Sequence, residues 1–198
     1  MKNFFKKSII SSIVGFSLIT SVSAETITVS NTNTSGVGSL HQAIVDANAN
    51  PSPTTIKFNL SGNKTIPVSS LGLPVITAPL EIDAEAKGNV TLLGGSIGQG
   101  GANPALRFDN AAGGSTVKFL IFDHFLFAIQ TQVGGLTIAN NQFKNNQGGI
   151  DVRVYANQQT ISENEFLTPN VLGVQMNSTS GHSICLLYTS DAADDSLR

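Results

Sequence analysis

Residues 136–143 read LTIANNQF, and residues 159–166 read QTISENEF. Three pairs of side chains recur at matching positions in these two segments, each pair 23 residues apart: Ile138 and Ile161, Asn141 and Asn164, and Phe143 and Phe166. Apolar and polar residues alternate within each copy, which is the pattern of a strand with one buried face. A repeat of this length indicates stacked units that bury their apolar faces against one another. The two segments therefore predict a solenoid of short strands.

Looser copies extend the repeat toward the N-terminus. FLIFDHF (119–125) places Leu120, Asp123 and Phe125 in the Ile, Asn and Phe positions, 18 residues before the first full copy. A second strand signal recurs in ALRF, AIQT, DVRV and GVQM, and its central residues form one predicted column: Leu106, Ile129, Val152 and Val174. Glycine pairs predict the turns between strands: Gly113–Gly114, Gly134–Gly135 and Gly148–Gly149.

Stacking these units in parallel register, about 4.8 Å apart, places like side chains over like. The predicted columns are aliphatic (Ile138, Ile161, Ile184), aromatic (Phe125, Phe143, Phe166) and polar (Asp123, Asn141, Asn164). Stacked rings add about 0.5–1.5 kcal/mol per pair, and stacked amides hydrogen-bond along the axis. A leucine-rich-repeat solenoid would need a Leu-dense strand, and an antiparallel sandwich would lack such columns. The expected fold is an all-β parallel β-helix, with its coils in residues 81–184.

Residues 25–80 differ from the repeat and predict an N-terminal capping module. Ser39 followed by Gln42 is a capping box that begins a short helix. Its apolar face comprises Leu40, Ala43, Ile44 and Ala47. The segment 48–53, which holds two prolines, ends the helix before a strand in TIKF (55–58). We expect this helix to cover the first coil, whose core and edge would otherwise be exposed.

The segment GSLHQAIVDANANPSPTTIKF (38–58) resembles the N-terminal motif of exported bacterial right-handed parallel β-helix proteins of the pectin-lyase-like superfold. These include relatives of polymorphic outer-membrane proteins and adhesin-like proteins. LGLPVITAPLEIDA (71–84) is similar to that family's transition into regular coils. His41 and Thr54 depart from the family, which commonly has an Arg and an acidic residue there. The resemblance implies a right-handed coil, a place at the cell surface or outer membrane, and an adhesin-like function.

The first 24 residues have the layout of a secretory signal peptide. Lys2, Lys6 and Lys7 precede an apolar run that ends in small residues, with Val22 and Ala24 at the −3 and −1 positions of a cleavage site. An uncleaved membrane anchor is the alternative interpretation. Cys185 is the only cysteine, so no intrachain disulfide can form. We expect an exported protein held together by its fold alone.

The repeat breaks after Ile184. The next Asn and Phe positions hold Leu187 and Thr189, and the segment that follows has neither strand alternation nor a turn. CLLYTSDAADD (185–195) resembles the translation of a transposase adapter used in preparing sequencing libraries. We therefore interpret residues 185–198 as a non-native tail on a chain truncated within its coils. A genuine disordered tail is the alternative.

Composition and candidate sites give no sign of catalysis. A net charge of −2 provides no basic surface for nucleic acid. An outward row of Arg107, Gln130, Arg153 and Gln175, with Asp151 beside it, suits either sugar binding or simple solvation. Asp123 is interpreted as a ladder residue. Glu163 and Glu165 are expected to point outward in one turn, with too few converging oxygens for calcium. No metal spacing links the three histidines, His41, His124 and His182. The Asn-x-Ser/Thr triplets at Asn63, Asn89 and Asn177 are expected from composition.

We therefore assign no catalytic, cofactor-binding or metal-binding residue and expect no cofactor. The favoured function is the N-terminal fragment of a secreted or surface-exposed β-helix protein, an adhesin-like or binding passenger without catalytic activity of its own. Its expected partner is an extracellular polysaccharide or a host or cell-surface ligand, with membrane association only through export or a missing C-terminal anchor. The alternative is a polysaccharide lyase or glycoside hydrolase whose active-site coils lie beyond the break.

Overall fold

In a computed structural model, short parallel strands make up most of the regular secondary structure of the described residues. The structure describes residues 24–95, 104–109, 111–167, 170, 172–177, 180–185 and 187–190. The predicted signal peptide, apart from Ala24, and the tail from residue 191 onward lie outside these residues.

The strands form three sheets. Sheet A has seven strands: β1 (Glu25–Val29), β2 (Thr54–Phe58), β4 (Leu80–Asp83), β7 (Thr116–Lys118), β10 (Thr137–Ala139), β13 (Thr160–Ser162) and β16 (Ser183–Cys185). Sheet B has six: β3 (Thr65–Pro67), β5 (Val90–Leu93), β8 (Leu120–Asp123), β11 (Gln142–Lys144), β14 (Glu165–Leu167) and β17 (Tyr188–Ser190). Sheet C has four: β6 (Leu106–Phe108), β9 (Phe127–Thr131), β12 (Gly148–Val152) and β15 (Leu172–Met176).

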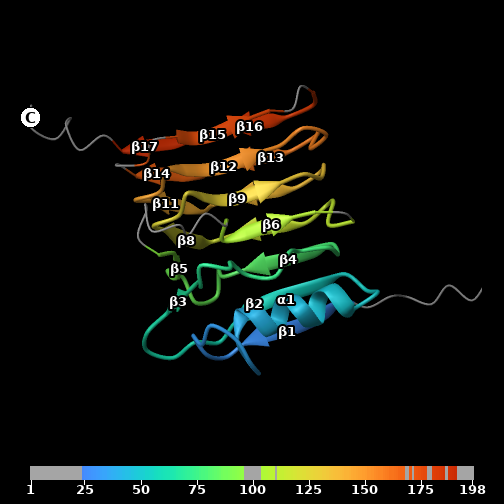
Figure 1. The fold of residues 1–198 in the computed structure, drawn as a ribbon, viewed down its shortest axis with the longest axis vertical. Helices are drawn as coiled ribbons and strands as arrows, with labels where there is room; N and C mark the ends of the chain where they lie inside the picture. Colours follow the sequence, from blue (N-terminus) through green and yellow to red (C-terminus); the bar gives the residue numbers. More distant parts are fainter. Residues whose placement is uncertain are drawn as a thin grey trace, which may run out of the picture.

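From β4 onward the chain passes from sheet A to sheet B to sheet C and back, one coil above the last (Figure 1). All the strand pairs of the described coils are parallel, for example β7 with β10 and β10 with β13. Because each strand pairs with its equivalent in the next coil, a residue lies over the residue one repeat later. The predicted parallel β-helix is confirmed.

The aliphatic column of sheet A is confirmed. Ile138 pairs with Ile161, and Ile161 pairs with Ile184. The same column continues toward the N-terminus through Val117 and Ile82. All of these side chains are buried except Ile184 on the last strand, which is 43% exposed. In-register stacking therefore builds a continuous core through the coils.

The aromatic column contains Phe122 and not the predicted Phe125. Ring centroids are 5.1 Å apart for Phe122 and Phe143 and 4.8 Å apart for Phe143 and Phe166, with the rings 9° from parallel in both pairs. The repeat here is therefore 21 residues long, not 18. FLIFDHF carries a Phe every third residue, so its alignment can slide by three residues and still match an aromatic side chain.

The same three-residue shift in alignment makes two more predicted positions wrong. β8 pairs with β11 so that Ile121 faces Gln142 and Asp123 faces Lys144. Leu120 therefore takes the Asn position that was predicted for Asp123, and the aliphatic position predicted for Leu120 belongs to Val117. Asp123 is not a member of the polar column.

Asn141 and Asn164 form the predicted ladder between coils. The Leu120 N–H donates to Asn141 Oδ1, and the Asn141 N–H donates to Asn164 Oδ1, each over 3.0 Å. Asn164 Nδ2 donates back to the Ile138 carbonyl over 2.8 Å. Both side chains are buried, so these bonds satisfy backbone groups at the corner between sheets A and B.

Two further ladders were not predicted. At the corner between sheets B and C, the Phe125 N–H donates to Asn146 Oδ1, and the Asn146 N–H donates to Asn170 Oδ1, each over 2.8 Å. Before sheet A, the Leu136 N–H donates to Gln159 Oε1 over 3.2 Å. At each of these corners a polar side chain from the next coil thus pairs a backbone N–H.

Two predictions for sheet C are wrong. Ile150, not Val152, pairs with Ile129 and Val174, whereas Val152 pairs with Thr131 and Met176. Gly148 and Gly149 lie inside β12 and do not form a turn. A Cβ on Gly148 would lie 2.3 Å from Phe127 Cε1, and one on Gly149 would lie 2.5 Å from Phe166 Cε1. These glycines therefore leave room for aromatic rings. Gly114 and Gly135, with φ of 80° and 78°, do lie in turns as predicted.

Helix α1 (Leu40–Ala49) lies at the N-terminal end of the stack beside β1 and β2 (Figure 1). Its predicted face of Leu40, Ala43, Ile44 and Ala47 is buried. Ser39 Oγ accepts the Gln42 N–H over 3.2 Å, which confirms the N-cap. The reciprocal bond of a capping box is not formed, because Gln42 Nε2 donates to Asp46 Oδ1 over 2.8 Å.

The prediction that the segment after Ile184 lacks strand structure is wrong for Tyr188–Ser190. These residues form β17, which pairs with β14 so that Thr189 faces Phe166. Leu187 therefore occupies the position after Asn164 in the ladder. A leucine side chain has no oxygen to accept the Asn164 N–H. The non-native origin of residues 185–198 stays a prediction.

We predict that Asn141→Ala lowers the free energy of unfolding by about 2–3 kcal/mol, because it leaves buried backbone groups without partners. Asn140→Gly is the matched control. Asn140 is exposed and has a φ of 56°, which glycine adopts readily, so the change should stay within about 0.5 kcal/mol. Urea unfolding of both variants measures the difference. Equal losses would contradict a stabilising role for the ladder.

Candidate functional site

An open groove of about 340 Å³ runs along the corner where sheet A turns into sheet B. Its lining residues come from four successive coils: Glu85, Gly88, Asn89, Phe119, Leu120, Ile121, Asn140, Asn141, Gln142, Glu163 and Glu165. Asn141 at its base belongs to the ladder, so the groove is built directly on the corner that holds the coils together.

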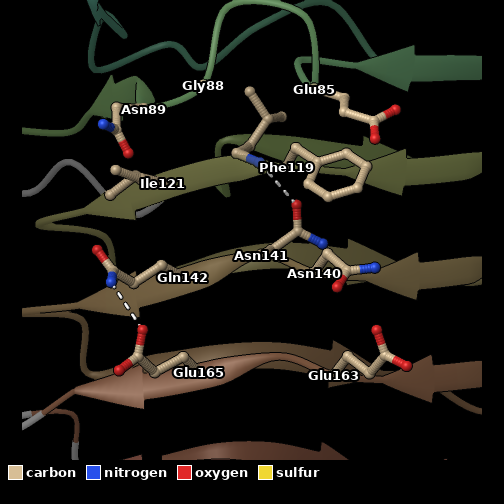
Figure 2. A pocket seen from close by; sticks show the side chains of 11 residues that line it. Glu85, Gly88, Asn89, Phe119, Ile121, Asn140, Asn141, Gln142, Glu163 and Glu165 are labelled. Atoms are coloured by element: carbon tan, nitrogen blue, oxygen red, sulfur yellow. Dashed lines mark hydrogen bonds between the residues drawn. The ribbon is translucent and has the colours of Figure 1, made fainter.

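Figure 2 shows two columns of outward side chains along this groove. One column descends through Glu85, Phe119, Asn140 and Glu163. The other descends through Asn89, Ile121, Gln142 and Glu165. The register of sheet B fixes the last three members of the second column, because Ile121 faces Gln142 and Gln142 faces Glu165. Thr91, not Asn89, is the residue that pairs with Ile121. The side chains therefore follow one another at the spacing of the coils, about 4.8 Å.

The corner residues have left-handed backbone. The φ angles are 54° at Asn89, 62° at Phe119, 56° at Asn140 and 55° at Glu163. Asn adopts this conformation readily, whereas other L-residues do so at a cost of about 1–2 kcal/mol. Phe119 is therefore an unusual occupant, and its half-buried ring presents an apolar surface among polar neighbours (Figure 2). The repeat pattern did not reveal this position, because FLIFDHF (119–125) was aligned as one continuous copy of the repeat.

Carboxylates and amides supply the polar groups of the groove. Glu85 and Glu163 are exposed, and Glu165 Oε2 accepts a hydrogen bond from Gln142 Nε2 over 2.8 Å. Glu163 and Glu165 lie outside the core as predicted. The lining residues include no lysine, arginine or histidine, so the groove carries three negative charges without an opposing charge of its own.

A neighbouring network on sheet A holds four charges. Lys118 Nζ lies 2.8 Å from Glu81 Oε1 and 3.5 Å from Asp83 Oδ2, and Lys57 Nζ lies 3.7 Å from Asp83 Oδ2. The hydrogen bond to Glu81 raises the pKa of Lys118 above its ordinary value of 10.5, against the effect of burial. Two cations and two carboxylates make this network neutral overall.

The predicted outward row on sheet C has one wrong member. The register aligns Arg107, Gln130, Asp151 and Gln175. Arg153 lies beyond the end of β12, and its Nε donates to Asp151 Oδ2 over 2.6 Å. Gln130 Nε2 donates to the same oxygen over 3.0 Å, and Asp151 is only 1% exposed. The protein's own side chains therefore occupy this carboxylate, which makes it a poor ligand site.

The remaining candidates are scattered. His41 lies on α1, His124 follows β8, and His182 accepts the Gln159 N–H through Nδ1 over 3.3 Å. Over the described ranges, no group of three or more His, Cys, Asp or Glu side chains could hold a metal ion. Asn63, Asn89 and Asn177 are exposed, as is Cys185 in β16.

Asp123 lies at the end of β8 in a small charged cluster. Its carboxylate accepts hydrogen bonds from Asn145 Nδ2 over 2.8 Å and contacts His124 Nδ1 at 2.6 Å and Lys144 Nζ at 3.2 Å. Burial favours a higher pKa for Asp123, but the hydrogen bonds from Asn145 and Lys144, the charge of Lys144 and the contact with His124 together outweigh burial. The pKa of Asp123 therefore lies below its ordinary value of 3.8. The cluster stabilises the turn that follows β8.

The groove presents hydrogen-bonding and charged groups to solvent. Glycoside hydrolysis uses two carboxylates on either side of a sugar, and catalysis gains most where water is excluded. Glu85 and Glu163 are exposed along an open groove. The lining has no serine, cysteine or histidine, so its three glutamates are the candidates for a base or nucleophile. The same exposed groups offer hydrogen bonding to hydroxyls and attraction of cations.

Comparison with known proteins finds no family model, curated protein or solved structure that matches this chain. Among the residues that the structure describes, no helix has the length and apolar character needed to cross a membrane.

We predict that Asp123→Asn lowers the free energy of unfolding at pH 7 by about 1–2 kcal/mol, because bonds to a charged acceptor are lost. A lowered carboxylate pKa gives stability that is present above 3.8 and is lost as the pH falls through the folded-state value. The difference between the variant and the wild type should therefore shrink progressively as the pH falls below 3.8. Urea unfolding from pH 7 into this acidic range, with Asp46→Asn as the control, measures the effect. A difference that stays the same at every pH would contradict it.

Proposed function

We propose that this chain is part of a secreted or surface-exposed, pectin-lyase-like β-helix protein that binds an extracellular polysaccharide or cell-surface glycan without cleaving it. The groove along the corner between sheets A and B carries the proposal. Carboxylates, side-chain amides and one aromatic ring line it, and such groups recognise sugar hydroxyls and the apolar face of a sugar ring. Two features support export to the outer surface of the cell: the N-terminal segment, in which lysines precede an apolar run, and the motif in residues 38–58.

The solenoid suits a polymeric ligand because it repeats its own surface. Ile121, Gln142 and Glu165 follow one another in register on adjacent strands. A chain of sugar units that runs along the axis would meet a new polar or apolar side chain at each coil. Stacked repeats commonly present extended binding surfaces of this kind. Adhesion to a glycan is therefore the function that the geometry supports best.

Phe119→Asn tests this function with little change to the backbone. Asn already occupies the same left-handed corner position at Asn89 and Asn140, so the variant removes the ring and keeps a favourable φ. We predict binding to one or more polysaccharides, at least tenfold weaker in Phe119→Asn, measured on a glycan array and by calorimetry. Val37→Ala, at a side chain that is 91% exposed and outside the groove, should bind as the wild type does.

Incubation with each bound polysaccharide completes the test. The proposal expects no new reducing ends and no unsaturated uronate products. Release of either would favour the alternative, a glycoside hydrolase or polysaccharide lyase. Failure to bind any polysaccharide or cell-surface glycan would overturn the proposed function.

A further inference from the structure

We infer that the groove selects glycans that carry protonated amino groups, such as oligomers of deacetylated hexosamines, over glycans rich in uronic acid. This inference rests on the proposed function and names the ligand class of the same site. Four features support this ligand class: the groove itself, its charge balance, the fixed position of one carboxylate, and the aromatic ring.

The charge balance comes first. Glu85, Glu163 and Glu165 give the groove three carboxylates, and no cationic side chain lines it. Two lysines approach the groove from outside its lining. Lys118 is engaged by Glu81 and Asp83, and Lys64 Nζ donates to the Gly88 carbonyl over 3.4 Å, so the three carboxylates still outnumber the lysine charge that no carboxylate engages. Charges interact more strongly near a protein surface than in bulk water, because the local dielectric constant is lower. An ammonium group is therefore attracted into the groove, whereas a uronate carboxylate is repelled.

One carboxylate is already held in place. Gln142 Nε2 donates to Glu165 Oε2 over 2.8 Å, which leaves the other oxygen of Glu165 available to a ligand. A group that is fixed before binding loses less conformational entropy when the ligand arrives. The amide oxygens of Gln142 and Asn140 lie along the same two columns and can accept hydrogen bonds from an ammonium or a hydroxyl (Figure 2).

The aromatic ring favours the same ligand. Phe119 lies between Glu85 and Asn140 in the first column (Figure 2). Lys118 Nζ lies 6.0 Å from the centroid of this ring, at the outer limit of a cation–π contact, and its charge is paired with Glu81 and Asp83. A sugar ring that stacks on Phe119 can direct an amino substituent toward the carboxylates of the neighbouring coils. The ring thus provides contact area for the sugar, and the carboxylates make the groove selective for positively charged ligands.

The test compares three probes on the purified full chain: short oligomers of glucosamine, the same oligomers fully N-acetylated, and oligogalacturonates. The glucosamine oligomers should bind at least tenfold more tightly than the N-acetylated ones, and their binding should weaken as salt is raised. Glu163→Gln should weaken binding of the glucosamine oligomers at least threefold and leave the N-acetylated oligomers unchanged. Asp46→Asn, which removes an exposed carboxylate on α1, is the matched control and should have no effect.

The outcomes separate the inference from the proposed function. Equal or tighter binding of N-acetylated oligomers or oligogalacturonates would overturn the inference and leave the proposed function in place. Glucosamine binding that is unaffected by Glu163→Gln and Phe119→Asn would also overturn the inference, because another surface would then hold the ligand. If no probe and no glycan on the array binds, the proposed function and the inference are both wrong.

Discussion

The buried side-chain amides at the corners of the coil are the interaction on which the rest of the structure depends. Strand pairing satisfies the backbone within each sheet, but the chain leaves that pairing wherever it turns into the next sheet. Asn141, Asn146, Asn164 and Gln159 pair backbone N–H groups of the preceding coil at these places. Since buried polar groups without partners are costly, these amides hold successive coils at one spacing. The register of every column, and of the groove above it, follows from that spacing.

The prediction from sequence was correct where the two full copies of the repeat align residue by residue. Ile138 with Ile161, Asn141 with Asn164 and Phe143 with Phe166 agree in the structure because each position differs in chemistry from its neighbours. The prediction failed in the looser copy. Phe119, Phe122 and Phe125 are three residues apart, so hydrophobic pattern alone could not choose among them. The left-handed bend at Phe119 decides the alignment, and no pattern of apolar residues reveals it.

The candidate site was less accessible to sequence reasoning than the fold. Alternation indicated that Glu163 and Glu165 lie outside the core, but it did not indicate that a corner brings them beside Phe119 and Gln142. On sheet C the prediction aligned the exposed Arg153 with Gln130, whereas the structure aligns the buried Asp151 with it. Asn146 and Gln159 lie at corners, and their ladder positions were not predicted either. Corners depend on single backbone angles, whereas strands depend on patterns that several residues share.

The left-handed corner also separates the surface from the interior. At Asn89, Phe119, Asn140 and Glu163 the backbone has nearly the same conformation, although the four side chains differ in charge, size and polarity. The buried columns on either side stay apolar through the same coils: Ile82, Val117, Ile138 and Ile161 on sheet A, and Leu92, Phe122, Phe143 and Phe166 on sheet B. A single substitution at one of these positions can therefore alter what the outer surface recognises without repacking the interior. A lineage of such proteins could diversify its ligands coil by coil while its architecture stays constant.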